Sequence, residues 1–419
     1  MAASAMLALL LLVGSVMGGS TPQEGPYKHL AVFTEVLSRI KSEYVEEPDM
    51  KSVTLGALNG LLEAVDPCAS YLSAEQYKAY LKDQQATKAD VGLVLARRYG
   101  YVGIVDAIAG SPAAKAGLTT GDVLEAIQGV STRDMPLAYA EQLLRGDAGS
   151  SVEISVLRVR KPEPQKITLV RAKLEYPAVT TKMLNGQIGY IEAESLAGTR
   201  QVEIAQAAKA LEQQGAKKLI LDLRHDATGT PENGVAVANA FMDKGLITYL
   251  QGQKFPRKNF EADPAKTISR LPLAVLTNRG TAGGAEVAAA ALLDSKRAQV
   301  IGERTYGYAA FRRAVTVDDG SAIILAVAKY YSPSGKAIQD TGVVPSVLSV
   351  ETEPYVDLDE EEGVPDKPEK PEPAKPTEED PVVKRAIEVL NGSPVQSATG
   401  PARTEGSPAM PDSFHKPRL

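Results

Sequence analysis

Short apolar segments alternate with amphipathic helical patterns between residues 166 and 350, and few folds accommodate this alternation. Leu219–Arg224 and Leu273–Thr277 are almost continuously apolar, as expected of strands that are covered on both faces. A helical pattern follows each of them, at Glu232–Asp243 and at Ala285–Asp294. Strands and helices that alternate through short loops predict a mostly parallel sheet covered by helices.

Two glycine-rich turns follow the ends of apolar strands in this region. One is Asn278–Glu286, which leads into a helical pattern, and the other is Gly302–Ala309. Loops at strand ends hold side chains on a rigid scaffold, so these turns have the form of an active-site frame. Neither turn carries a Ser, Cys, His or Lys where a nucleophile or a base is expected.

Residues 88–160 contain short strands with well-marked turns. Ser111, Pro112 and Gly117 define both ends of one short helix, because they suit the N-cap, the first helical position and the position after the C-cap. With the turn and strand at Gly121–Ile127, this helix makes the segment resemble a PDZ domain of the bacterial protease type.

The PDZ resemblance implies a peptide-binding groove between a strand and a helix. In such domains a peptide joins the sheet as an extra strand, and backbone amides of the preceding loop hold its C-terminal carboxylate. The corresponding segment here comprises Gly92, Leu93, Val94 and Leu95, which we expect to contact the peptide. The alternative is a PDZ fold that only packs against its neighbours and binds nothing.

Further motifs resemble those of the C-terminal processing, or tail-specific, proteases of the S41 serine peptidase family. They are Asp66–Leu72, Leu221–Arg224, Tyr330–Gln339 and Gly342–Pro345. The resemblance runs from about Tyr27 to Val347. It implies an S41 protease-like α/β core with an inserted PDZ domain and a helical N-terminal segment.

The resemblance also assigns the catalytic positions. In this family a serine at a helix start is the nucleophile, a lysine is the general base, and a glutamine four residues later orients the lysine. Gly283 falls on the serine, Tyr308 on the lysine and Arg312 on the glutamine, without a gap in the alignment. Glycine has no side chain, and tyrosine, with a reference pKa of about 10, is a poor base near neutral pH. The sequence therefore predicts a pseudoprotease that retains the architecture and binds polypeptides.

An active serine-type peptidase with relocated catalytic groups is the alternative. Thr281 offers a hydroxyl two residues before Gly283, and His225 lies in a loop where the family has Asn-Asn-Pro-Gly-Gly, a loop that helps to shape the oxyanion site. These two residues are the weak candidates for a substitute pair. A loop histidine that faces solvent is the simpler interpretation of His225.

The composition of the chain limits the classes of partner and ligand that we expect. The net charge of −6 and the pI near 5.4 argue against nucleic acid, which requires a basic surface. The single cysteine excludes an intrachain disulfide, and the three histidines have no metal-ligand spacing, so we expect no metal and no cofactor. The expected partners are polypeptide C-termini or unfolded segments, an active protease relative, and a second copy of the chain that pairs through the N-terminal helices.

The apolar run at Met6–Met17 has the length of a signal-peptide core, so we expect a periplasmic or otherwise extracytoplasmic protein. An uncleaved membrane anchor is the alternative. The predicted boundaries are 1–20 for the signal peptide, 27–85 for the helical segment, 88–160 for the PDZ domain, 166–350 for the α/β core, 351–379 for a disordered acidic and proline-rich linker, 380–392 for a short helix and 393–419 for a disordered tail.

Overall fold

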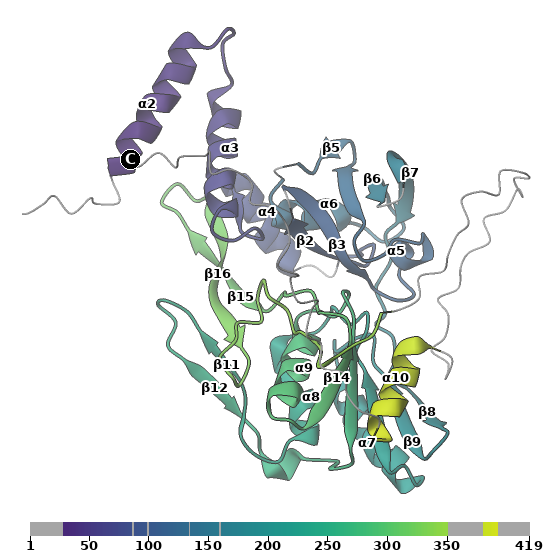
Figure 1. Ribbon diagram of the computed structural model, residues 1–419. Helices are drawn as coiled ribbons and strands as arrows, with labels where there is room; N and C mark the ends of the chain where they lie inside the picture. The colour runs from purple at the N-terminus through teal and green to yellow at the C-terminus, as the bar shows by residue number, and fades with distance from the viewer. Residues whose placement is uncertain are drawn as a thin grey trace, which may run out of the picture. The chain divides into compact units, whose positions relative to one another are not determined.

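The chain divides into two compact units, Met1–Leu61 and Leu62–Leu419. The computed structural model describes residues 28–85, 88–98, 100–133, 135–158, 161–350 and 380–392 (Figure 1). The predicted signal peptide, acidic linker and C-terminal tail lie outside the described residues.

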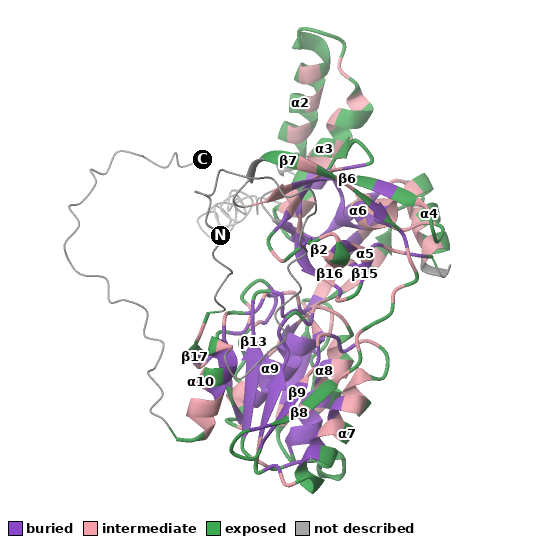
Figure 2. Cartoon of the chain, turned by 90° about the vertical axis from the view of Figure 1, so that its right-hand side faces the viewer, coloured by how far each residue is buried: buried purple, intermediate pink, exposed green. Residues whose placement is uncertain are grey.

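The first unit is helical, as predicted. It contains α2 (Lys28–Glu43) and most of α3 (Met50–Glu63). Large apolar side chains on α2 are at least half exposed, among them Leu30, Val32 and Val36, and Figure 2 shows much of this helix as exposed. Among residues 28–61, which the structure describes, α2 thus leaves apolar side chains exposed rather than burying them in a core.

The second unit begins with strand β1 (Ser70–Leu72) and helix α4 (Ala74–Gln85). The start of α4 is a capping box: the Ser73 amide donates to the Gln76 side chain at 3.0 Å, and the Gln76 amide donates to Ser73 Oγ at 3.3 Å. Both bonds satisfy amides that a helix start leaves without partners.

The PDZ sheet has the strand order β2-β3-β4-β6-β7, with β5 paired to β4. Helix α5 follows β3, and helix α6 precedes β6, with Ser111 capping α5 as predicted. The elements are β2 (Leu93–Arg98), β3 (Tyr101–Ala107), α5 (Pro112–Lys115), β4 (Val123–Ile127), β5 (Val130–Ser131), α6 (Leu137–Leu144), β6 (Ser151–Arg158) and β7 (Lys161–Val170).

Strand β7 differs from the sequence prediction. It pairs with β6 from Lys161 to Val170, so the predicted core start at residue 166 falls within this strand. The prolines at 162 and 164 are more typical of a turn. Because β7 is the edge strand of this sheet, it accommodates residues that have no amide proton to donate.

The α/β sheet has the order β17-β14-β13-β10-β9-β8 and is parallel except for β8, which confirms the prediction of a mostly parallel sheet. Its elements are β8 (Thr180–Leu184), β9 (Ile188–Glu192), α7 (Arg200–Gln213), β10 (Lys218–Asp222), α8 (Pro231–Phe241), β13 (Leu273–Thr277), α9 (Gly284–Asp294), β14 (Ala298–Gly302), β17 (Val347–Leu348) and α10 (Pro381–Leu390).

Alternate residues of these strands face opposite sides of the sheet. Leu219 and Leu221 belong to the core that α7, α8 and α9 cover. Ile220, between them, belongs to a second core with Val382 and Val383 of α10. Helices on both faces explain why the strands are almost continuously apolar.

A smaller sheet was not predicted. It has the order β1-β16-β11-β12, with β15 paired to β16. The remaining elements are β11 (Leu246–Gln251), β12 (Lys258–Glu261), the short 3₁₀ helix η1 (Pro264–Lys266), β15 (Ala310–Thr316) and β16 (Ala322–Tyr331). Strand β15 follows the second glycine-rich turn and therefore carries Arg312.

Candidate functional site

The first glycine-rich turn connects the end of β13 to the start of α9, and Asn278 organises it. Its side-chain oxygen accepts hydrogen bonds from the amides of His225 at 3.1 Å and Gly280 at 3.0 Å. Its own amide donates to Thr281 Oγ1 at 3.0 Å. These bonds fix the turn and join it to the loop after β10.

Gly283, which the sequence resemblance assigns to the nucleophile position, has a strained backbone. Its φ of 62° and ψ of −118° lie where residues with a side chain are rarely found. A Cβ atom at this position would lie 3.8 Å from the Tyr308 carbonyl oxygen and 3.9 Å from that of Gly229, which are ordinary contacts. The space around Gly283 thus admits a Cβ atom, although the backbone conformation is one that glycine favours.

Glu286, in the first turn of α9, connects the two glycine-rich turns. Its fully buried carboxylate accepts bonds from the amides of Gly283 at 3.0 Å, Gly307 at 2.7 Å and Tyr308 at 2.7 Å, and from the Thr305 hydroxyl. Burial raises its pKa to about 7, although these four donors oppose the shift. The two turns are held together by one acidic side chain.

Tyr308 and Arg312, which the sequence resemblance assigns to the lysine and glutamine positions, lie together. The Arg312 guanidinium carbon lies 4.5 Å from the centre of the Tyr308 ring, and Arg312 Nη2 lies 3.6 Å from Asp66 Oδ1. Burial raises the pKa of Tyr308 well above its ordinary value, although the positive charge of Arg312 opposes the shift. The phenol therefore stays protonated and cannot act as a base near neutral pH.

Cys68 lies close enough to this pair to influence it electrostatically. It is buried, and burial raises the pKa of its thiol, a shift that the positive charge of Arg312 opposes. The thiolate, which is the nucleophilic form of cysteine, is therefore disfavoured. The sequence around Cys68 gave no signal that this residue would lie near Arg312.

Thr281 is fully buried, and its hydroxyl forms hydrogen bonds with backbone groups. It donates to the Leu223 carbonyl at 2.8 Å and accepts from the Asn278 amide at 3.0 Å. In this arrangement its proton points to a carbonyl oxygen, and the hydroxyl supports the turn.

His225 is about half exposed and has a positive φ of 56°. Its Nδ1 lies 3.3 Å from Asp106 Oδ1 of β3, and its Nε2 lies 2.8 Å from the side-chain nitrogen of Asn278. The histidine therefore connects the α/β core to the PDZ sheet. Burial raises the pKa of Asp106, whereas His225 lowers it.

The predicted peptide-contacting segment lies at the start of β2, the first strand of the PDZ sheet. Leu93 and Val94 are partly buried, and Leu95 is buried in the domain core. Gly92 has a φ of 84°, and a Cβ atom there would lie 2.3 Å from the Cβ of Ser111, so only glycine fits.

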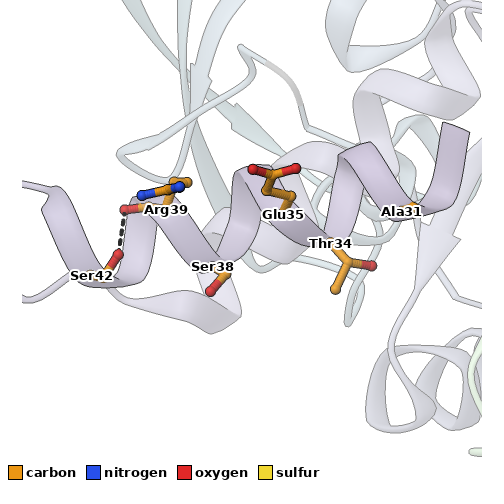
Figure 3. Close-up of a pocket in the computed structure, with 6 residues that line it drawn as sticks. All are labelled: Ala31, Thr34, Glu35, Ser38, Arg39 and Ser42. Atoms are coloured by element: carbon orange, nitrogen blue, oxygen red, sulfur yellow. Dashed lines mark hydrogen bonds between the residues drawn. The ribbon is translucent and has the colours of Figure 1, made fainter.

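A separate hollow lies in the first unit. It is lined by Ala31, Thr34, Glu35, Ser38, Arg39 and Ser42, all from α2 (Figure 3). It contains no candidate catalytic residue. Within the described ranges, no cluster of three His, Cys, Asp or Glu side chains has the geometry of a metal site. No helix within them has both the length and the apolar character to cross a membrane.

Comparison with known proteins identifies the architecture. Residues 187–349 match the model of peptidase family S41, and residues 103–158 match a PDZ domain model. The carboxy-terminal processing protease CtpA of Bacillus subtilis is 31% identical over 366 residues, which are 85% of this chain and 77% of the relative. The carboxyl-terminal-processing protease of Synechocystis sp. is 31% identical over 314 residues, 73% of each chain.

A solved structure agrees with these relatives. The photosystem II D1 C-terminal processing protease superposes with a TM-score of 0.64 at 28% identity, over 76% of this chain and 92% of that chain. The chain belongs to the S41 family of C-terminal processing proteases, with a PDZ domain.

Proposed function

We propose that this chain is a pseudoprotease, which keeps the S41 architecture and has lost its peptide-bond chemistry. The observation that carries the proposal is Gly283: the residue at the proposed nucleophile position has no side chain, although the space around it admits a Cβ atom. The base position supports the same conclusion, since Tyr308 is a buried phenol with a raised pKa. Arg312, at the third position, pairs with Asp66.

The proposed activity is binding of polypeptides, C-termini included, through the groove of the PDZ domain. Strand β2 lies at the edge of its sheet and is the element to which an added strand would pair. We propose that the chain acts in this way as a scaffold, or as a regulator of an active relative.

The decisive experiment is an activity assay on the purified protein. It is incubated with a denatured protein substrate and with a fluorophosphonate probe, which labels activated serine and threonine nucleophiles. We expect neither cleavage nor labelling. Cleavage or labelling that disappears in Thr281→Ala would establish the alternative, an active peptidase with relocated groups.

We further propose that the protein is exported and that it forms a homodimer. The apolar run at Met6–Met17 supports export to an extracytoplasmic compartment, and N-terminal sequencing of the mature protein from that compartment would reveal cleavage after it. The exposed apolar residues of α2 support a homodimer. Sedimentation of the chain with and without residues 27–81 tests this, since the dimer should be lost with them.

A further inference from the structure

The loop before β2 is where a PDZ domain of this kind would hold the carboxylate of a bound peptide. The loop consists of Asp90, Val91 and Gly92, followed by Leu93 at the start of the strand. Within the described sheet β2 pairs with β3 alone, so its other edge is free for an added strand. Backbone amides of this loop are the donors that such a domain offers to a carboxylate.

Two of these donors are already occupied by the chain itself. Asp90 Oδ1 accepts hydrogen bonds from the Val91 amide at 2.6 Å and from the Gly92 amide at 3.0 Å. Its other oxygen, Oδ2, accepts from Arg145 Nε at 3.3 Å. The Asp90 side chain thus occupies two backbone amides of the loop and the Arg145 cation, which would otherwise be available to a peptide carboxylate.

This internal carboxylate is held firmly. The backbone of Asp90 forms two hydrogen bonds with Ala172, each of 3.0 Å. Ala89 forms two more with Gly146, each of 3.0 Å, just after Arg145, which caps the end of α6. The loop is therefore hydrogen-bonded to the segments that follow β7 and α6.

A second carboxylate at this position would be disfavoured for two reasons. It would find two amides already bonded, and it would lie close to the negative charge of Asp90, where like charges repel. An internal segment that passes through the groove places no carboxylate there, so it needs no free amides and is not repelled by Asp90. Its affinity comes from main-chain pairing with β2.

We propose that the PDZ groove binds an extended internal segment of an unfolded polypeptide and does not depend on a free C-terminus, and that Asp90 is the residue that sets this specificity. The proposal deepens the polypeptide-binding function proposed above and rests on it. It narrows the ligand from polypeptides in general to internal segments.

The test uses matched peptides. An array of randomised ten-residue peptides is synthesised twice, with a free C-terminal carboxylate and with a C-terminal amide, and is probed with the full chain. Affinities of the strongest pairs are then measured by fluorescence anisotropy. For the unaltered chain we expect affinities for the two forms to agree within about threefold, because the carboxylate contributes nothing.

Asp90→Ala frees both amides and Arg145, so we expect the free-acid peptides to bind at least about tenfold more tightly than the amides. Asp90→Asn keeps an acceptor oxygen and removes the charge. If the alanine variant does not fold, the affinity ratio of free-acid to amide peptides is measured on this variant. Asp147→Ala removes an exposed carboxylate of the same domain and should leave the ratio unchanged.

Two outcomes overturn the proposal, and they are distinguishable. A clear preference of the unaltered chain for free-acid peptides refutes the role of Asp90 and leaves polypeptide binding intact. Absence of saturable binding to every peptide, in the unaltered chain and in both Asp90 variants, refutes the polypeptide-binding function together with this specificity.

Discussion

If the catalytic frame is intact and only its side chains are missing, peptidase chemistry should return when they are restored. The required changes are Gly283→Ser, Tyr308→Lys and Arg312→Gln. A serine fits at the first position, because its Cβ would make only ordinary contacts, at 3.8 Å and 3.9 Å. Holding a residue with a side chain at the φ of 62° and ψ of −118° costs about 1–3 kcal/mol, equivalent to a melting temperature lower by a few degrees.

The other two changes provide the base. Burial at residue 308 would lower the pKa of a lysine there and favour the neutral amine that accepts the serine proton. Removing the guanidinium at residue 312 costs Asp66 an ion pair with an N–O distance of 3.6 Å. The Asp66 carboxylate still accepts hydrogen bonds from the amides of Cys68 at 3.0 Å and Ala326 at 3.1 Å.

The assay is labelling by a fluorophosphonate probe, followed by cleavage of a denatured protein substrate. We expect the triple variant to be labelled and the unaltered chain to remain unlabelled. The matched control combines Gly283→Ala with the same two changes, because alanine carries the same backbone strain without the hydroxyl. A triple variant that melts cooperatively and stays unlabelled would refute the claim that the frame is intact.

Further predictions concern stability. Glu286→Gln removes acceptor capacity from both turns, and we expect a loss of about 2–4 kcal/mol of unfolding free energy in urea titrations. The pKa of Glu286 is about 7 in the folded chain, against an ordinary value of 4.5. Between these two pH values Glu286 is therefore protonated in the native state and ionised in the unfolded state. The stabilisation that comes from this proton is complete below pH 4.5 and is lost as pH rises through 7. The corresponding fall of unfolding free energy with pH should be absent from Glu286→Gln. Gly234→Ala would place a methyl group 1.9 Å from the Gly284 carbonyl oxygen, and we expect a loss of about 3 kcal/mol. Gly60→Ala, in an open part of α3, should instead gain about 0.5–1 kcal/mol, and equal thermal shifts for the two glycine variants would contradict this packing.

The α/β sheet could be predicted from the sequence because its strands are apolar on both faces and its helices are periodic. Strand β15 could not, because residues such as Arg312 and Arg313 give it the composition of a loop. It becomes a strand through pairing with β16, a partner that is not evident from local sequence.

The family resemblance assigns Gly283, Tyr308 and Arg312 to the catalytic positions, and that assignment stays a prediction. The contacts around these residues could not be predicted from the sequence. The bonds of Glu286 go largely to backbone amides, which every residue type except proline carries, so they leave no sequence signal. The pairing of Arg312 with Asp66 joins segments far apart in the chain, and only the folded sheet brings them together.

Helix α10 has a consequence for the order of folding. The last strand of the α/β sheet ends at Leu348, whereas the helix that covers its second face begins at Pro381. During synthesis the sheet is therefore complete while Tyr190, Ile220 and the other residues of that face still lack their covering helix. In that interval an apolar surface faces water, and the nascent chain is then most exposed to aggregation.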